Sequence, residues 1–270
     1  MPELVDLKIT DYCDKKCKFC YQDSTTEGIH ARLYNIDKIL ETLSESGVFE
    51  VAIGGGEPIF HPGIIKILEK CKKYNIKPNI TTADYDWFEY ESFRNLISSF
   101  VGGIGVSITS ISDLKRLKKI LKGDDSGITF HYILGMQSIE RFKSILNYVN
   151  TNFKYKTIVL LGYKSTGRGS NLQEVQYKQD WVKLAKKYEY VSISIDTKLA
   201  TMYKHFLDKN NINDKTYYQS EGVYSKYIDA VNLTVAESSY SGQGKALCDD
   251  KSSWLSRHDV ERLKNLLVDV

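Results

Sequence analysis

The run DYCDKKCKFCY at residues 11–21 places three cysteines, Cys13, Cys17 and Cys20, in the spacing C-x₃-C-x₂-C. It directly follows residues 4–9, where apolar side chains broken by two polar ones predict a first β-strand. The cysteines are therefore expected on the loop that leaves the carboxyl end of that strand. Three thiolates on one loop can bind three irons of a [4Fe–4S] cluster. Since ferredoxin-type clusters take four cysteines, the fourth iron would be left for another ligand.

A second motif, VAIGGGEP at residues 51–58, begins in another apolar strand and ends in a glycine-rich turn. Glycines allow the backbone to approach a ligand closely. Glu57 offers a carboxylate that can accept hydrogen bonds from an ammonium group. The order of the two motifs, each at the end of a predicted strand, indicates two parts of one site.

The two motifs together resemble those of the radical S-adenosylmethionine (radical SAM) superfamily, with Phe19 as the aromatic of C-x₃-C-x-Φ-C and Gly-Gly-Glu-Pro at residues 55–58. The resemblance implies one [4Fe–4S] cluster whose open iron chelates SAM, with Gly55, Gly56 and Glu57 holding the SAM amino group. One electron would break the sulfonium C–S bond, and the resulting 5′-deoxyadenosyl radical would abstract a substrate hydrogen. A reductant such as flavodoxin or ferredoxin would supply that electron.

Strand and helix patterns alternate along most of the chain, which predicts βαβ crossovers and a parallel α/β sheet. About six such units favour a partial (β/α)6 barrel, the fold that the resemblance also implies. In such folds the site lies on loops at the carboxyl ends of the strands. The strands are predicted at residues 4–9, 48–53, 77–82, 105–108, 128–134, 157–161 and 191–195. The helices are predicted at residues 35–43, 64–71, 88–100, 114–121, 139–149 and 182–188.

The pattern changes near residue 216, so we expect a barrel over residues 1–215 and a small extension over 216–270. A β-hairpin is predicted at residues 224–235 and a terminal helix at 258–268. The extension loosely resembles the SPASM extension of peptide-modifying radical SAM proteins. Its one cysteine, Cys248, is too few for an auxiliary cluster. We consider Cys248 as a hydrogen donor to a substrate radical, although a buried structural thiol is the simpler alternative.

Further residues at strand ends are candidates for ligand contacts. By the resemblance, Thr82, Ser107 and Leu161 would face SAM together with Phe19, although Thr82-Ala83-Asp84 departs from the common Thr-Asn-Gly. The glycine-rich loop 162–169 could cradle a phosphate or carboxylate, or be a plain solvated loop. The candidate substrate residues, expected to face the cavity, are His131, Tyr132, Tyr163, Lys164 and Arg168.

Composition narrows the class of protein. The formal net charge of +3 does not indicate a nucleic-acid partner, and five cysteines, three of them clustered, favour a metal site over a disulfide framework. No apolar run could span a membrane and no signal peptide precedes the first strand, so we expect a cytoplasmic protein.

Three functions stay open from the sequence. The first is a radical SAM enzyme acting on a peptide or protein side chain, because of the SPASM-like hairpin. The second is such an enzyme acting on a small phosphorylated or nucleotide-like metabolite, because of loop 162–169. The third is a non-catalytic binding protein stabilised by zinc on Cys13, Cys17 and Cys20, with His30 as a further candidate ligand.

Overall fold

The computed structural model describes residues 2–175, 180–209, 222–242, 244–250 and 254–268. The described strands are β1 (Leu4–Thr10), β2 (Glu50–Gly55), β3 (Lys77–Thr82), β4 (Ile104–Ile108), β5 (Ile128–Leu134), β6 (Thr157–Gly162), β7 (Ser192–Ile195), β8 (Ser225–Asp229), β9 (Thr234–Ala236) and β10 (Lys245–Ala246). The described α-helices are α1 (Leu33–Glu45), α2 (Ile64–Lys73), α3 (Glu91–Phe100), α4 (Ile111–Leu121), α5 (Ile139–Asn152), α6 (Asp180–Lys187), α7 (Thr197–Lys209) and α8 (Arg257–Val268). The 3₁₀ turns are η1 (Pro58–Phe60), η2 (Asp86–Glu89) and η3 (Gly167–Asn171).

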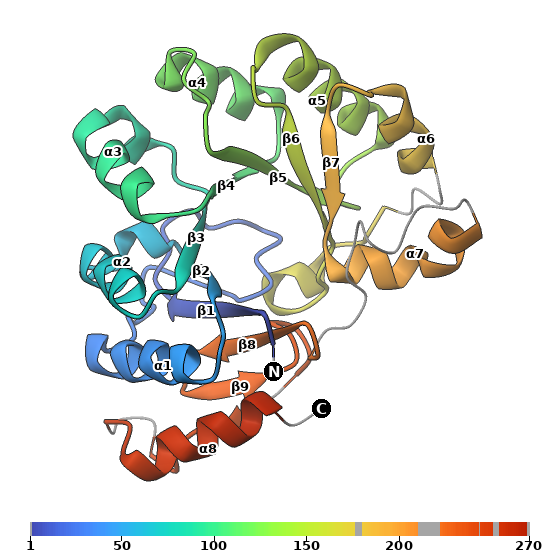
Figure 1. Cartoon of the computed structure of the whole chain (residues 1–270). Helices are drawn as coiled ribbons and strands as arrows, with labels where there is room; N and C mark the ends of the chain where they lie inside the picture. Colours follow the sequence, from blue (N-terminus) through green and yellow to red (C-terminus); the bar gives the residue numbers. More distant parts are fainter. Residues whose placement is uncertain (1, 176–179, 210–221, 243, 251–253, 269–270) are drawn as a thin grey trace.

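The strands form one sheet in the order β10-β9-β8-β1-β2-β3-β4-β5-β6-β7. Strands β1 to β7 are parallel and follow chain order, and Figure 1 shows them on a curve with the helices outside it. Strands β7 and β10 are the two ends of the sheet, so the sheet does not close into a barrel. The expected parallel α/β fold is confirmed, and β7 corresponds to the short strand predicted at residues 191–195.

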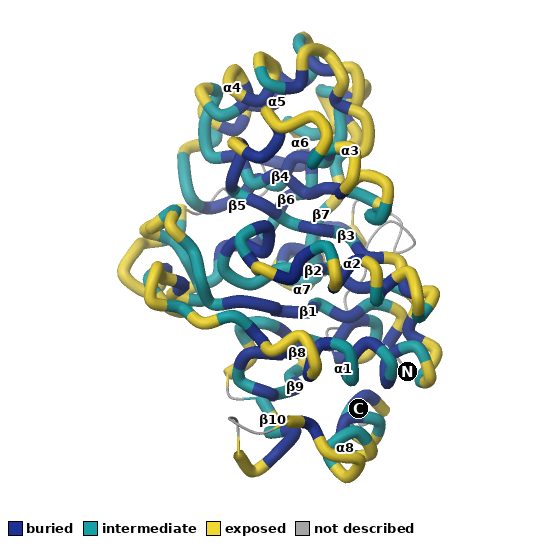
Figure 2. The backbone as a smooth tube through the Cα atoms, turned by 90° about the vertical axis from the view of Figure 1, so that its left-hand side faces the viewer, coloured by how far each residue is buried: buried dark blue, intermediate teal, exposed yellow. Residues whose placement is uncertain are grey.

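Strand side chains alternate between the two faces of the sheet. In β5, Phe130 and Tyr132 are buried on the helix side, whereas Thr129, His131 and Ile133 are half-buried on the inner side. Figure 2 shows the same contrast, with buried strands inside and exposed residues on the outer helices. Full burial of a large apolar side chain stabilises a fold by about 1.5–3 kcal/mol, so the helix-side residues hold the sheet together. The inner side is left for polar groups and ligands.

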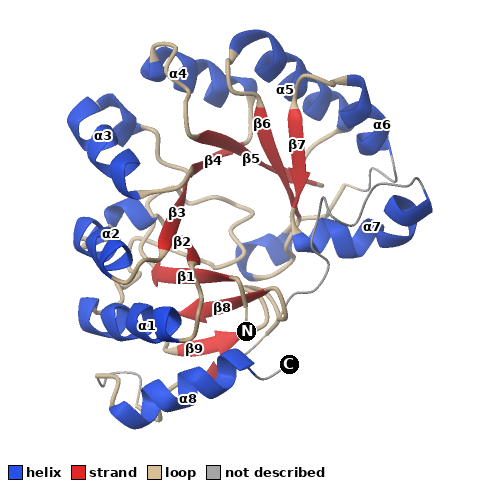
Figure 3. Cartoon of the chain, in the orientation of Figure 1, coloured by secondary structure: helices blue, strands red, loops and turns tan. Residues whose placement is uncertain are grey.

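The C-terminal hairpin and helix are present as predicted, and the hairpin joins the main sheet. Strand β8 pairs in parallel with β1, on the edge away from β2, and β9 turns back on β8 (Figure 3). Helix α1 begins two residues before the predicted start at Asn35, and Arg32 is its N-cap residue. The side chain of Asn35 accepts the amide of Leu255 at 3.0 Å and so holds the segment before α8. The expected boundary between residues 215 and 216 lies outside the described residues.

Predicted and observed strands agree to within two residues at each end. Helix α7 and the two-residue strand β10 had not been predicted from the sequence. Among the described residues, no helix is both long and apolar enough to cross a membrane.

Candidate functional site

The cysteine loop, defined here as residues 11–31, leaves β1 and folds back on itself. The amide of Cys13 donates to the carbonyl oxygen of Thr25 at 2.9 Å. The amide of Cys20 donates to the carbonyl oxygen of Cys17 at 3.2 Å, in a turn that brings these two residues together. All three cysteines are half-buried, and they share the loop at the carboxyl end of β1.

The three thiols lie close enough to influence one another's protonation. Burial raises the pKa of Cys13 to about 11, and the charge of Glu57 acts in the same direction. Burial also raises the pKa of Cys17, with the neighbouring Cys20 adding to the shift and the guanidinium of Arg168 opposing it. Three neighbouring thiolates therefore need a positively charged centre, which the iron ions of a cluster would supply.

The surroundings of His30 differ from those of a zinc ligand. Its Nδ1 lies 2.8 Å from Oγ1 of Thr10, and its ring packs 5.2 Å from the ring of His61. In the part of the chain that the structure describes, no three His, Cys, Asp or Glu side chains are placed to bind a single metal ion. Zinc ligands must converge on one point, whereas each cysteine of a [4Fe–4S] cluster binds a different iron. Three cysteines on one loop can each bind a different iron of such a cluster.

Loop 54–58 is bonded directly to the cysteine loop. The amide of Gly56 donates to the carbonyl oxygen of Thr10 at 2.7 Å, and the amide of Glu57 donates to that of Tyr12 at 2.8 Å. A Cβ on Gly56 would lie 2.1 Å from the carbonyl oxygen of Tyr12, which is closer than any real contact. This glycine is therefore required by the approach of one loop to the other, and the two sequence motifs form one structural unit.

The side chain of Glu57 is buried, and its contacts are with the chain itself. Its Oε1 accepts from the hydroxyl of Thr82 at 2.8 Å, and its Oε2 accepts from the amides of Ala83 at 2.9 Å and Asp84 at 3.2 Å. Burial raises the pKa of Glu57 to about 7, against the opposing effect of these donors. These contacts make Glu57 an anchor for the loop after β3, and its contact with an ammonium group stays a prediction. The hydroxyl of Thr82, expected to face SAM, belongs to the same anchor.

Two of the expected cavity residues lie side by side on the inner face. Ser107 on β4 and His131 on β5 are register partners, and both are half-buried. The imidazole of His131 lies against Gly105, where a Cβ would be 2.4 Å from its Cε1. Burial lowers the pKa of His131 to about 4, so the imidazole is neutral at physiological pH. Leu161 on β6 occupies an equivalent half-buried position.

The expectation that Tyr132 faces the cavity is wrong. Its ring stacks on Phe142 of α5 with the centroids 5.4 Å apart, on the helix side of the sheet. Successive residues of a strand point to opposite faces, so Tyr132 and His131 cannot both face inward.

Loop 162–169 holds the cysteine loop, and the expected phosphate cradle is not formed by its arginine. The guanidinium of Arg168 donates to the carbonyl oxygen of Cys17 at 3.0 Å, the carboxylate of Asp23 at 2.8 Å and the carbonyl oxygen of Ser24 at 2.9 Å. Tyr163, expected to face the substrate, is buried and donates its hydroxyl to the carbonyl oxygen of Gly169. Both side chains therefore stabilise loops.

Lys164 lies between two tyrosine rings. Its Nζ is 4.4 Å from the ring centre of Tyr21 and 4.8 Å from that of Tyr240, and it donates to the hydroxyl of Ser239 at 3.1 Å. The Nζ of Lys198 is 5.0 Å from the same Tyr240 ring. Of the three candidate substrate residues on loop 162–169, Tyr163 is uncharged and Arg168 pairs with the carboxylate of Asp23. The ammonium group of Lys164 instead contacts two aromatic rings and a hydroxyl.

Cys248 is buried away from the cysteine loop. Its thiol lies 3.2 Å from the carbonyl oxygen of Asp250. Cys248 follows β10 by two residues, and in the sheet β10 is separated from β1 by β9 and β8. This position favours the structural alternative over a hydrogen donor. Phe19 is half-buried within the cysteine loop, beside Gly169.

Lys8 connects the C-terminal hairpin to the cysteine loop, a link that sequence reasoning missed. Its buried Nζ lies 3.0 Å from the carboxylate of Asp229 at the end of β8 and also pairs with Asp11. Burial lowers the pKa of Lys8, but the two carboxylates together raise it above its ordinary value. The available signal was a lysine at an inward position of a strand, which needs a partner when buried.

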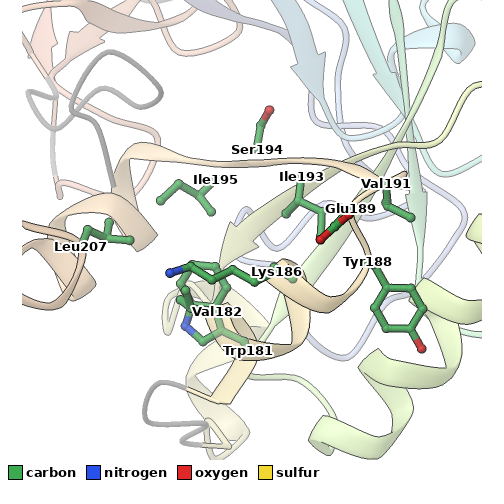
Figure 4. Close-up of a pocket in the computed structure, with 11 residues that line it drawn as sticks. Trp181, Val182, Lys186, Tyr188, Glu189, Val191, Ile193, Ser194, Ile195 and Leu207 are labelled. Carbon is green, nitrogen blue, oxygen red and sulfur yellow. The ribbon is translucent and has the colours of Figure 1, made fainter. Parts of the chain in front are cut away.

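A cavity of about 390 Å³ lies between α6, β7 and α7 (Figure 4). Its lining is mostly apolar and includes Trp181, Ile193 and Ile195. None of the predicted site residues lines it. The cavity is therefore separate from the cysteine site.

Comparison with known proteins agrees with the geometry. The model of the Radical SAM superfamily matches residues 7–168, more than half of the chain. A probable GTP 3′,8-cyclase of Methanococcus maripaludis (strain C6) is 30% identical over 120 residues, which cover 43% of this chain and 39% of that relative. A GTP 3′,8-cyclase of Clostridium botulinum (strain Okra) is 23% identical over 76% of this chain and 70% of its own length. The match thus spans about two fifths of the first relative.

Among solved structures, Streptococcus suis SuiB bound to the precursor peptide SuiA has a TM-score of 0.72 at 20% identity, covering 98% of this chain and 67% of that chain. The same protein bound to S-adenosylmethionine has a TM-score of 0.67 at 18% identity, covering 98% of this chain and 68% of that one. These likenesses concern the fold, and the family match covers both sequence motifs. The chain belongs to the radical SAM superfamily.

Proposed function

We propose that this chain is an enzyme that binds one [4Fe–4S] cluster through Cys13, Cys17 and Cys20 and uses SAM to remove a hydrogen atom from its substrate. The observation that carries the proposal is the direct bonding of loop 54–58 to the cysteine loop. When both are bound, the cluster supplies one electron to the sulfonium of SAM, and SAM supplies the 5′-deoxyadenosyl group that takes the hydrogen atom.

The residues of this chain position the two cofactors. We assign Gly55 and Gly56 to the loop that receives the SAM amino group, with Glu57 and Thr82 acting through that loop. Arg168 fixes the cysteine loop from the other side. Exclusion of water and contact with the adenosyl part of SAM fall to the half-buried side chains Phe19, Ser107 and Leu161.

For the substrate we favour a peptide or protein side chain, with His131 and Lys164 as its contacts. The similarity to SuiB extends over 98% of this chain, and SuiB was solved with a bound precursor peptide, which supports that choice. A small phosphorylated or nucleotide-like metabolite is the second candidate, supported by the relatives named GTP 3′,8-cyclase. A flavodoxin or ferredoxin is the proposed electron donor.

The deciding experiment uses anaerobically reconstituted protein. We expect about four irons and four sulfides per chain, and 5′-deoxyadenosine after incubation with SAM and dithionite. Cys17→Ala should lose the iron and the product together. Zinc in place of iron, with no SAM cleavage by the wild-type protein, would overturn the proposal in favour of a zinc-stabilised binding protein.

The matched control is Cys71→Ala, which removes a thiol in the same way at a distant site. Cys71 is fully buried in the core on α2. Loss of its sulfur should cost about 1–2 kcal/mol of stability and leave the iron content unchanged. Equal loss of iron in both variants would mean that folding, rather than ligation, is being measured.

A further inference from the structure

Lys164, Lys198 and Tyr240 bring together segments from the two ends of the sheet. Lys164 follows β6 and Lys198 lies in the first turn of α7, after β7. Tyr240 lies between β9 and β10, at the other end of the strand order. The C-terminal extension therefore reaches across the open side of the sheet, at the carboxyl ends of β6 and β7. Parallel α/β folds place their ligands at these ends.

The ammonium group of Lys164 is half-buried among neutral groups. Tyrosine faces attract a cation, but the attraction is worth only about 0.5–2 kcal/mol and leaves the charge in place. Among the described residues, Lys164 forms no ion pair, and its one hydrogen bond goes to Ser239. A lysine has three N–H donors, so two remain for a ligand.

Lys198 adds a second positive charge against the same ring. Its Nζ and that of Lys164 lie 5.0 and 4.8 Å from the centre of Tyr240. The carboxylate of Glu174 interacts with the ammonium group of Lys198 and partly balances its charge. Lys164 instead faces two aromatic rings and a hydroxyl. Like charges that share a neighbour repel each other, and an anion between or beside them would relieve that repulsion.

The position suits a substrate contact. Tyr21, on which Lys164 rests, directly follows Cys20 of the cysteine loop. A group bound by Lys164 would thus lie beside the cysteine loop, with the inner face of the sheet next to it. The two rings limit the access of water, which strengthens a charged contact.

We propose that Lys164, assisted by Lys198 and framed by Tyr21 and Tyr240, binds an anionic group of the substrate, either a carboxylate or a phosphate. This inference rests on the proposed function, because it names what the same site would take. It also gives the C-terminal extension a role, since Tyr240 and Ser239 complete the subsite.

The test measures binding by calorimetry on the anaerobically reconstituted protein, with two probes. Inorganic triphosphate represents the phosphate source, and a hexapeptide of glutamate represents the carboxylate source, with hexaglutamine as its neutral counterpart. We expect one anionic probe to bind and hexaglutamine not to bind. Lys164→Gln should weaken that binding about tenfold, and Lys198→Gln should weaken it less. The anion that binds identifies the source.

The matched control is Lys154→Gln. Lys154 also lies over a tyrosine, with its Nζ 5.3 Å from the ring of Tyr155. It precedes β6, so it lies at the amino ends of the parallel strands, whereas Lys164 lies at their carboxyl ends. The Lys154→Gln variant should bind the same anionic probe as the wild type, with the same affinity. Binding of neither probe, or equal binding by Lys164→Gln and the wild type, would overturn the inference. Formation of 5′-deoxyadenosine by the wild type is scored separately, so failure of the subsite and failure of the proposed function can be told apart.

Discussion

Loops 54–58 and 162–169 are both glycine-rich, both follow a parallel strand, and both lie against the cysteine loop. The first loop joins by backbone bonds that need glycine at Gly56, and it anchors the next loop through the buried carboxylate of Glu57. The second loop joins through side chains, namely the guanidinium of Arg168, the hydroxyl of Thr166 and the ammonium group of Lys164 over the ring of Tyr21. A Cβ on Gly167 would lie 2.7 Å from the carbonyl oxygens of Cys20 and Tyr21, so in both loops a glycine also allows one chain segment to approach another.

The largest effect is expected from Gly56→Ala. Its Cβ would meet the carbonyl oxygen of Tyr12 at 2.1 Å, so the two loops must separate. We expect iron content and 5′-deoxyadenosine formation to fall together, the latter by about 100-fold, since small misplacement of reacting groups costs that much. Gly54→Ala is the matched control, because a Cβ there meets nothing within 4 Å. Equal losses of iron and product in the two variants would show that the close approach of Gly56 to Tyr12 is not the cause.

A smaller effect, on stability, is expected from Glu57→Gln. The glutamine oxygen can take the place of Oε2 and accept from the amides of Ala83 and Asp84. Its NH2 group then faces the amide of Ile59, which donates to Oε1 of Glu57 at 3.4 Å, so this buried donor loses its acceptor. That loss should cost about 1–3 kcal/mol. Thermal unfolding of the protein without SAM would measure it, and an unchanged melting temperature would contradict the anchor.

The same variant tests the pH dependence. The pKa of Glu57 is raised by burial from 4.5 to about 7 in the folded chain. Folding therefore favours its protonated form, and the stability that this form contributes is full below about pH 4.5 and is lost as the pH rises through 7. The wild type should lose more melting temperature between pH 5 and pH 8 than Glu57→Gln. If the melting temperatures of the wild type and of Glu57→Gln fell equally between pH 5 and pH 8, Glu57 would not be the cause of the pH dependence.

The smallest effect is expected from Arg168→Lys on the second loop. Lysine keeps the charge but cannot reproduce the planar fork that reaches Cys17, Asp23 and Ser24 at once. We expect about three- to tenfold slower 5′-deoxyadenosine formation with most of the iron retained. Arg116→Lys, which alters an exposed ion pair with Asp86 of η2, is the control and should change neither quantity. A full loss of iron in Arg168→Lys would contradict this ranking, because loop 162–169 would then matter as much for iron binding as loop 54–58.

Local patterns were sufficient for much of the fold. Alternation and turn residues predicted strands β1 to β7 to within two residues, because apolar periodicity reports which face a strand buries. The same alternation could have excluded Tyr132 from the cavity, since its neighbour His131 already faces inward. Helix α7 also had a readable signal, with apolar Leu199, Ala200 and Leu207 on one side.

The contacts of the site were beyond such reasoning, because they join distant parts of the chain. Arg168 bonds to residues 144 to 151 positions earlier, and Lys8 bonds to Asp229 across 221 positions. Nothing in the neighbourhood of either residue in the sequence identifies its partner. The cysteines and the glycine motif were found because their spacing is itself local.

The pairing of β8 with β1 has a consequence for the order of events during synthesis. The ribosome releases the chain from its N-terminus, so β1 emerges first and waits as an edge strand until residues 225–229 have been made. Lys8 meets Asp229 only then, and the cysteine loop gains that support late. Under the proposed function, insertion of iron and sulfide into the fully supported site waits until Asp229 has been made. The three cysteines must then stay reduced while the residues between Cys20 and Asp229 are synthesised.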